Sequence, residues 1–229
     1  GAAYHYFGDG ACGDAVGGGF IYTNKRTLAI GLAYSIEDAR QGPRKPDEML
    51  NDFKQHPAVA PLVRGGRLVE YSAKTIPEGG ADAIPQLVHD GAVIVGDAAS
   101  LTLNNGIHLE GTNMAVESGR LAGEAIVDAR ETGRTDAEAL EPYAENLRSS
   151  YVVENLEHYN WFGDFAAQEK EFLFEELPRA LTEAEREYFR MDTTPKADHV
   201  ERAKQMLLQA TGGWFGAIKH AWKYRRLLQ

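Results

Sequence analysis

The amino-acid sequence predicts an α+β fold with a mainly antiparallel sheet and a helical C-terminal region. Three features of the chain support this prediction. Short aromatic and β-branched runs separated by turn residues fill the first third, which is the pattern of antiparallel strands. A short apolar run followed by a long helical pattern stands in the middle. The rest of the chain is mostly helical in pattern and rich in aromatic residues.

The first third is expected to contain strands and one helix. Strands are predicted over residues 4–7, 20–23, 28–34 and 67–76. The helix is predicted over residues 47–56, where Pro46 precedes the first turn, Asp47 can cap it and Pro57 ends it. Pro77 and the glycines that follow it end the last of these strands.

The middle of the chain predicts a buried strand and a long helix. Residues 91–95 form a continuous apolar run, as expected for a strand that is buried on both faces. Gly96 and Asp97 follow directly. After a loop that contains asparagine and glycine, a helix is predicted over residues 111–131.

The last part of the chain is expected to be helical. Helices are predicted within residues 136–174, 182–190 and 200–210. Thr182 and Glu185 have the spacing of a capping box for the second of these. Residues 214–229 form an amphipathic, basic end.

The composition excludes several classes of function. The formal net charge of -10 argues against nucleic-acid binding. The single cysteine, Cys12, cannot form an intrachain disulfide, an iron–sulfur cluster or a cysteine-rich zinc site, so we expect no metal site. The single cysteine fits a reducing compartment, no signal peptide is visible, and no apolar window approaches the roughly 18 residues that span a bilayer. We therefore expect a cytoplasmic protein. The chain opens directly in a strand-like run at Gly1, so we expect a fragment of a longer polypeptide.

One glycine motif is interpreted as a chance match that does not bind a dinucleotide. Residues 8–13 match G-x-G-x-x-G, the pattern of a dinucleotide-binding loop. That loop needs a helix directly after it, because the helix N-terminus holds the pyrophosphate. Instead Gly17, Gly18 and Gly19 follow, and consecutive glycines disfavour a helix. We therefore interpret this segment as a flexible connection between strands.

The strongest candidate site follows the apolar strand. Gly96 lets the backbone turn and approach a ligand closely, and the small Ala98 and Ala99 keep the wall of the site low. The carboxylate of Asp97 can accept hydrogen bonds from ribityl or ribose hydroxyl groups. Free N–H groups at the helix start, near Gly111, can donate to an anion or to a developing negative charge.

The unit of strand, Gly96-Asp97-Ala98-Ala99, loop and helix resembles the second FAD fingerprint of a large flavoprotein group. That group includes aromatic hydroxylases and geranylgeranyl reductases. Within it, the chain looks most like the FixC-type electron-transfer flavoprotein dehydrogenases, relatives of electron-transfer flavoprotein–quinone oxidoreductase. The same resemblance is carried by residues 17–24, 56–62, 70–73 and 76–80.

This resemblance implies an FAD site with particular residues. Asp97 would bond the ribityl or pyrophosphate region of FAD, with Gly96 giving access. Backbone N–H groups of Gly111, Thr112 and Asn113 would face the pyrimidine edge of the isoalloxazine ring. The loop along the flavin would consist of Asn104, Asn105, Gly106, Ile107 and His108.

The resemblance also implies an FAD-dependent oxidoreductase that takes electrons from an electron-transfer flavoprotein and passes them to quinone or a ferredoxin-like protein. Residues 1–88 would be part of a substrate-domain sheet, residues 89–133 the C-terminal part of the FAD-binding domain, and residues 134–229 a helical region. The family's N-terminal βαβ unit is missing, so the chain alone is expected to be inactive. The four-cysteine cluster of eukaryotic quinone oxidoreductases is missing too, which favours the FixC-type branch.

Alternatives stay open at several points. The scaffold also suits a reductase of isoprenoid double bonds, and the chain could be a non-catalytic binding module. His108 could relay a proton to the flavin or only pack in its loop. Glu110 could be a catalytic acid, although complementing the helix N-terminus is favoured. Asn104 and Asn105 are expected to shape the turn rather than to do chemistry.

Two aromatic segments could bind a small molecule, a membrane surface or another protein. A quinone or lipid pocket could be bordered by His158, Tyr159, Trp161 and Phe162, but aromatic residues at helical spacing are more often core. The basic, tryptophan-bearing residues 214–229 could lie on a membrane surface or dock an acidic ferredoxin, or could be an ordinary terminal helix. Peripheral attachment at the inner face of the membrane is thus an alternative location.

Overall fold

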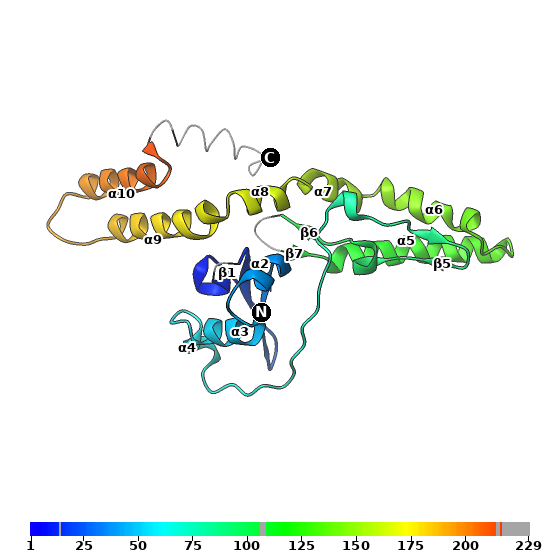
Figure 1. The fold of residues 1–229 in the computed structure, drawn as a ribbon, viewed down its shortest axis with the longest axis horizontal. Coiled ribbons are helices and arrows are strands. Elements are labelled where there is room, and N and C mark those ends of the chain that lie inside the picture. Colours follow the sequence, from blue (N-terminus) through cyan, green and yellow to red (C-terminus); the bar gives the residue numbers. More distant parts are fainter. Residues whose placement is uncertain (14, 106–108, 214–215, 217–229) are drawn as a thin grey trace. The chain divides into compact units, whose positions relative to one another are not determined.

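The structure is a computed structural model that describes residues 1–13, 15–105, 109–213 and 216. It combines helices with small antiparallel sheets, so the predicted α+β class is confirmed. The chain divides into two compact units, residues 1–65 with 169–229 and residues 66–168. Figure 1 shows the elements of both. The predicted boundaries after residues 88 and 133 concern functional parts and stay a prediction.

The first unit contains a three-stranded antiparallel sheet in the order β1-β2-β3. The strands are β1 (Ala3–Phe7), β2 (Gly17–Thr23) and β3 (Leu28–Tyr34). The register places His5 opposite Phe20 and Ile21 opposite Ile30. All three predicted strands are confirmed. β2 begins earlier than the predicted residue 20, because Gly17, Gly18 and Gly19 are paired residues of this strand.

The glycines of β2 allow a helix to lie directly on the sheet. α3 (Pro46–Gln55), which confirms the predicted helix, packs Phe53 against Gly19. A Cβ at Gly19 would lie 2.5 Å from Phe53 Cζ, so no larger residue fits there. The Phe53 ring also meets the Tyr6 ring edge-on, with the centroids 5.2 Å apart. The core of this unit consists of Ala11, Cys12, Ala15, Ile21, Met49, Phe53 and Val59.

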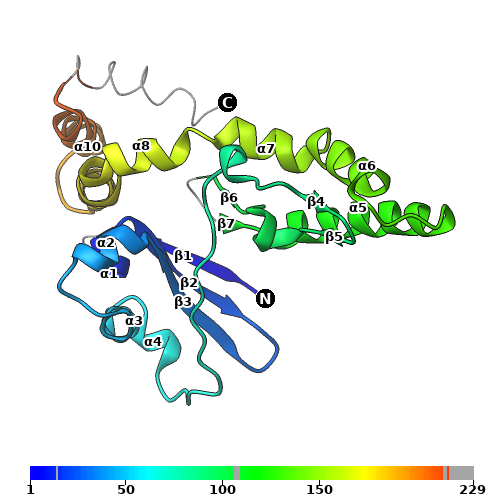
Figure 2. The same cartoon turned by 45° about the vertical axis from the view of Figure 1, so that its right-hand side comes forward.

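Short helices complete this part of the unit. They are α1 (Asp9–Cys12), α2 (Ile36–Gln41) and α4 (Ala60–Val63), and Figure 2 shows them beside the sheet. α1 lies inside the G-x-G-x-x-G match, yet β1 and β2 are antiparallel. A dinucleotide-binding βαβ unit needs parallel strands, so the match does not form such a unit, as predicted. The predicted flexible connection is wrong, because residues 9–12 form α1 and its Ala11 and Cys12 are buried in the core. Cys12 is 2% exposed, and burial raises the pKa of its thiol to about 12.

The C-terminal segment of the first unit is helical. A π-helical turn, η3 (Phe172–Glu176), leads into α9 (Leu177–Tyr188), and α10 (Lys196–Ala210) follows. The two helices predicted here exist, but both begin earlier than predicted. The predicted capping box is wrong, because Thr182 lies inside α9 and its hydroxyl donates to the Pro178 carbonyl at 2.8 Å.

The second unit begins with a segment that has no regular structure. Residues 66–80 pair with no strand in the described part of the chain, so the predicted strand over residues 67–76 is wrong. Leu68, Val69 and Tyr71 are 79%, 74% and 57% exposed. An alternating pattern produces a strand only where a neighbouring strand supplies backbone hydrogen bonds.

Short strands follow this segment. After the turn η1 (Ala81–Ala83) come two hairpins, β4 (Val88–His89) with β5 (Ala92–Val93) and β6 (Leu103–Asn104) with β7 (Leu109–Glu110). A strand is therefore present where it is predicted, within residues 91–95. The prediction that this strand is buried on both faces is wrong. Ala92 is exposed and Val93 is half-buried, because the described chain provides one antiparallel neighbour rather than two parallel ones.

Helices form the body of the second unit. They are α5 (Thr112–Glu131), α6 (Ala137–Arg148), α7 (Tyr151–Tyr159) and α8 (Phe162–Gln168), which confirms the predicted long helix and helical run. Asp136 and Ser150 cap α6 and α7 with side-chain acceptors. Figure 2 shows α5 and α6 side by side, joined by a short turn. The core between them includes Ala99, Leu101, Met114, Leu121, Ala125, Tyr143 and Leu147.

Candidate functional site

The Gly96-Asp97-Ala98-Ala99 motif forms a tight turn, η2 (Gly96–Ala99). Gly96 has φ +59°, a conformation that favours glycine. A Cβ at Gly96 would also lie 3.2 Å from Ala115 Cβ on α5, closer than such atoms normally approach. Ser100 ends the turn in the left-handed conformation. The motif therefore needs glycine both for its backbone geometry and for its closeness to α5.

Ser118 on α5 fixes this turn to the helix. The Gly96 N–H donates to Ser118 Oγ at 3.0 Å, and the Ser118 hydroxyl donates to the Ala115 carbonyl at 3.0 Å. Ser118 is fully buried, while Asp97 and Ala98 are exposed at the other side of the turn. Sequence reasoning missed Ser118. A serine among small residues on the inner face of a helix was the only available signal.

The start of α5 lies beside the Asp97 carboxylate. Gly111 is the N-cap residue, and no side chain caps the helix there. The position of a Cβ at Gly111 is 3.7 Å from Asp97 Oδ1 and 3.8 Å from Thr102 Oγ1. N–H groups in a first helical turn have no intrahelical acceptors and lie at the positive end of the helix dipole. The fold thus brings together a carboxylate, a hydroxyl and a set of backbone donors.

Thr102 contributes an unusual polar atom to this place. Among the residues that the structure describes, its Oγ1 is a buried side-chain oxygen without a hydrogen-bond partner. Thr102 is 5% exposed and stands between the buried Leu101 and Leu103. A threonine inside an apolar run forms no motif, so sequence reasoning missed it.

The loop asparagines form side-chain hydrogen bonds with carboxylate groups. Asn105 and Asn113 donate to the two carboxylate oxygens of Glu110 at 3.4 and 3.2 Å. Asn104 donates to Glu78 at 3.1 Å. These contacts suit the interpretation that the asparagines shape the loop and that Glu110 belongs to the helix start.

Part of the predicted flavin loop cannot be placed. Gly106, Ile107 and His108 lie outside the described residues. The structure brings Gly96, Asp97, Ala98, Gly111, Thr112 and Asn113 together around the start of α5, with Asn104 and Asn105 in the loop that leads there.

Tyr143 on α6 supports the strand that leads into the turn. Its hydroxyl donates to the Ile94 carbonyl at 2.7 Å, and its side chain has no exposed surface. Burial raises the pKa of Tyr143 to about 12, so the phenol stays protonated and keeps its donor. Sequence reasoning did not single out Tyr143. Its contact with a residue 49 positions away is visible only in the fold.

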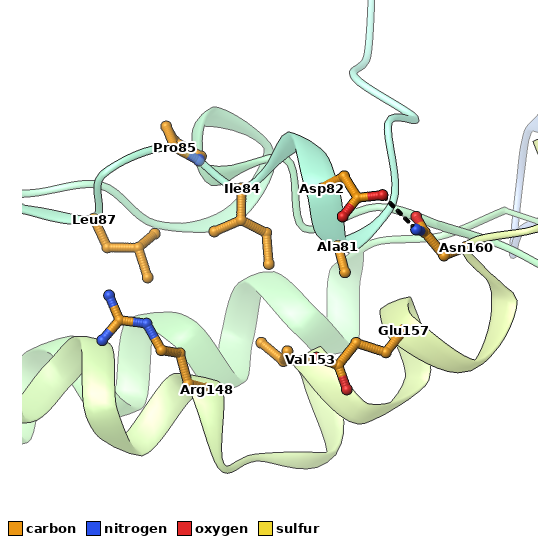
Figure 3. Close-up of a pocket in the computed structure, with 9 residues that line it drawn as sticks. All are labelled: Ala81, Asp82, Ile84, Pro85, Leu87, Arg148, Val153, Glu157 and Asn160. Atoms are coloured by element: carbon orange, nitrogen blue, oxygen red, sulfur yellow. Dashed lines mark hydrogen bonds between the residues drawn. The ribbon is translucent and has the colours of Figure 1, made fainter.

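A separate cavity of about 470 Å³ lies between the η1 segment and the helices α6 and α7. Its lining residues are Ala81, Asp82, Ile84, Pro85, Leu87, Arg148, Val153, Glu157 and Asn160. Figure 3 shows Ile84 and Leu87 directed toward the helices, and Asn160 donating to Asp82 at 2.7 Å. None of the predicted site residues lines this cavity, so it is distinct from the Asp97 site.

The aromatic segment near α8 packs largely on itself. Phe162 is buried, and the Trp161 ring meets Phe162 and Phe165 edge-on with centroids 5.9 and 5.3 Å apart. His158 and Tyr159 form a similar pair at 4.8 Å. Phe162 is therefore a core residue, whereas Tyr159 and Trp161 are half-buried and His158 is exposed, so the choice between core and pocket stays a prediction for these three.

The structure describes little of the segment predicted to meet a membrane. Residues 214–229 lie outside the described residues except for Gly216. Within the described part of the chain, no helix has both the length and the apolar character needed to cross a bilayer.

A buried histidine joins α9 to α10. His199 is 1% exposed, with Nδ1 2.8 Å from Glu187 Oε1 and Nε2 3.1 Å from Asp192 Oδ1. Arg190 and Arg202 also pair with Glu187, at 3.2 and 3.5 Å. The hydrogen bond from His199 lowers the pKa of Glu187, and hydrogen bonds from Thr194 lower the pKa of Asp192 to about 2. Sequence reasoning missed this cluster, which belongs to the packing of two helices rather than to the Asp97 site.

The α9–α10 pair is expected to lose stability in acid. Both carboxyl groups have a lowered pKa in the folded protein, so their contribution is present above the unfolded pKa of about 4. It is lost as the pH falls toward the folded value, which is about 2 for Asp192. Urea unfolding from about pH 5 to 2 should show a flatter pH dependence for Asp192→Asn than for the unaltered protein. Glu183→Gln, on the exposed side of α9, is the control and should keep the original slope. Equal slopes for all three would contradict the prediction.

Two family models match the chain at its two ends. A model described as "ETF-QO, ubiquinone-binding" matches residues 1–76, and one described as "ETF-QO/FixC family C-terminal domain" matches residues 164–229. ETF-QO abbreviates electron transfer flavoprotein-quinone oxidoreductase. These ranges nearly coincide with the two segments of the first compact unit, residues 1–65 and 169–229. The Gly96 turn and α5 lie between them.

Curated relatives align with most of the chain. "Probable electron transfer flavoprotein-quinone oxidoreductase YdiS" of Escherichia coli is 38% identical over 195 residues, which are 85% of this chain and 45% of YdiS. "Protein FixC" of Bradyrhizobium diazoefficiens is 38% identical over 211 residues, 92% of this chain and 48% of the relative. "Protein FixC" of Azotobacter vinelandii is 34% identical over 215 residues, 93% and 49% of the two chains. This chain spans about half the length of the curated relatives it matches.

The family models and the relatives agree with the resemblance that the Gly96-Asp97-Ala98-Ala99 unit and the flanking segments predict. The resemblance is therefore confirmed, and the chain belongs to the ETF-QO/FixC family.

Proposed function

We propose that the intact protein is an FAD-dependent oxidoreductase that takes electrons from an electron-transfer flavoprotein and passes them to quinone or a ferredoxin-like protein. The relative YdiS is named as an electron transfer flavoprotein-quinone oxidoreductase, and one matching family model is described as ubiquinone-binding. The observation that carries the proposal is the exposed Asp97 carboxylate beside the uncapped start of α5.

The residues around this place fit a polar, oxygen-rich cofactor. Asp97 offers acceptors for ribityl hydroxyl groups, and the exposed Ala98 leaves room beside it. The N–H groups of Gly111, Thr112 and Asn113 suit the pyrimidine edge of an isoalloxazine ring. The buried hydroxyl of Thr102 has no hydrogen-bond partner in the described chain, so a polar group of a bound cofactor would pair with it here. Bound FAD would supply the redox chemistry, while these residues would bind and orient it.

The proposal also assigns a role to each segment of the chain. Residues 89–133 form the C-terminal part of the FAD-binding domain, and residues 1–88 belong to the sheet of the substrate domain. Asn104, Asn105 and residues 106–108 run along the flavin, with His108 as the candidate proton relay. The basic residues 214–229 contact an acidic ferredoxin-like partner or the inner face of the membrane, since tryptophan and lysine there suit both surfaces.

Asp97→Ala in the intact protein is expected to weaken FAD binding about 10- to 150-fold. A charge-assisted hydrogen bond contributes about 1.5–3 kcal/mol, and its loss should appear directly in the dissociation constant. A flavin fluorescence titration measures this. Asp128→Ala, on the exposed side of α5, is the matched control and should bind FAD like the unaltered protein. Unchanged affinity in Asp97→Ala would show that this carboxylate does not face the cofactor.

The proposed reaction is tested with the FAD-loaded intact protein. Mixing with reduced cognate electron-transfer flavoprotein should bleach the oxidised flavin band, and adding a quinone or an oxidised ferredoxin should restore it. An FAD-loaded protein that is not reduced would contradict the proposal. Saturation of a prenyl lipid would favour the isoprenoid reductase instead, and an intact protein that holds no FAD would favour the binding module.

A further inference from the structure

We propose that the hydroxyl group of Thr102 is a direct ligand of the cofactor at the start of α5. This inference rests on the proposed FAD site and adds a residue that the Gly96-Asp97 motif does not contain. Its basis is one atom, Thr102 Oγ1, which is buried and has no hydrogen-bond partner within the described chain.

Three other hydroxyl groups on or beside the described helices have hydrogen-bond partners. Ser118 both accepts from the Gly96 N–H and donates to the Ala115 carbonyl. Thr132 donates to the Ala129 carbonyl at 2.8 Å, and Thr182 does the same with Pro178. Buried polar groups in native proteins are nearly always paired, so an exception needs an explanation. A bound ligand explains the unpaired hydroxyl of Thr102, because its Oγ1 lies near the Asp97 carboxylate and the N–H groups at the start of α5.

The surroundings of Thr102 show where that ligand would be. Leu101 and Leu103 on either side are 0% and 4% exposed and belong to the core. On its remaining side, Thr102 Oγ1 lies 3.8 Å from the point that a Cβ of Gly111 would occupy. Asp97 Oδ1 lies 3.7 Å from the same point. The Thr102 hydroxyl and the Asp97 carboxylate therefore lie on the same side of Gly111, the N-cap residue of α5.

The three kinds of group complement one another chemically. The Asp97 carboxylate only accepts, the first-turn N–H groups only donate, and a hydroxyl can do either. A flavin cofactor carries hydroxyl groups on its ribityl chain and alternating carbonyl and N–H groups on its pyrimidine edge. The Thr102 hydroxyl therefore completes a mixed set that a simple anion would not require.

The test compares stability without FAD and affinity for FAD in the intact protein. In Thr102→Val a methyl group of nearly equal size replaces the hydroxyl. Without FAD, this variant should be as stable as the unaltered protein or more stable, because it removes a buried unpaired hydroxyl. Its FAD dissociation constant should rise about 3- to 10-fold, as expected for one lost neutral hydrogen bond. Thr102→Ser keeps the hydroxyl and should retain most of the affinity.

Ser118→Ala is the matched control. Its hydroxyl is paired inside the protein, so its loss should lower the melting temperature both with and without FAD. If Thr102→Val binds FAD as well as the unaltered protein, the inference is overturned while the proposed FAD site stands. If Thr102→Val is less stable without FAD, its hydroxyl has a partner in the protein and the inference is also overturned. If the unaltered protein binds no FAD, the proposed function itself fails.

Discussion

Tyr143→Ala is expected to lower the free energy of unfolding by about 3–5 kcal/mol, the usual effect of removing a large aromatic side chain from a core. Tyr143 has no exposed surface and packs in the core with Ala99, Leu101 and Met114. Its hydroxyl also holds the Ile94 carbonyl at 2.7 Å. The variant would therefore leave a cavity and an unpaired carbonyl two residues before the Gly96 turn.

A conservative variant separates the two contributions of Tyr143. Tyr143→Phe keeps the ring and removes only the hydrogen bond, so the expected loss is about 0.5–1.5 kcal/mol. Urea unfolding gives both free energies. Amide hydrogen exchange should report the largest change over residues 92–103, where the strand and the turn depend on this contact. A loss below about 1.5 kcal/mol for Tyr143→Ala would mean that α6 does not pack on this segment as the structure shows.

Phe53→Ala is expected to have an effect of similar size, about 3–5 kcal/mol, in the first unit. Phe53 is 1% exposed and is the largest residue that α3 places on the sheet. Its ring lies on Gly19 and meets Tyr6 edge-on, so its removal opens a cavity that a glycine-containing strand cannot fill. The exchange rates of amide groups in β2 should rise most, because this ring covers the middle of that strand.

Two variants control the Phe53 experiment. Phe7→Ala removes an aromatic ring that is 48% exposed, and should therefore cost much less than Phe53→Ala. Gly19→Ala places a methyl group where the Phe53 ring lies, and should cost about 1–3 kcal/mol through overpacking. If Gly19→Ala were tolerated without loss, the close contact between α3 and β2 would be wrong, whatever the result for Phe53→Ala.

Much of the fold could be predicted because the signals were local. The three strands of the first sheet are short β-prone runs with a turn at Asn24, and α3 has Pro46 at its start. α5 also follows from its residues, because a glycine precedes a long run of helix-forming residues. In each case, neighbouring residues of the sequence supply the hydrogen bonds or the periodicity that the element needs.

The errors occurred where a partner far away in the sequence decides the outcome. Residues 67–76 alternate like a strand but meet no neighbouring strand in the described chain, and residues 91–95 have one short neighbour instead of two. β2 begins at Gly17 rather than at the predicted residue 20, because glycine is depleted in strands and gives no local strand signal. The ring of Phe53 explains the glycine at position 19, since it leaves no room for a side chain there.

The candidate site also combines features encoded by neighbouring residues with features that depend on distant residues. The sequence alone determined the Gly96-Asp97-Ala98-Ala99 turn, the helix after Gly111 and the family, because a tight turn and a helix start are encoded by adjacent residues. Only the tertiary structure decided that Ser118 holds the turn and that Tyr143 supports the strand before it. It also decided that Thr102 Oγ1 is buried without a hydrogen-bond partner among the described residues. Each of these depends on where distant groups meet in space, and hydrogen bonding of buried polar atoms is settled by that arrangement rather than by sequence order.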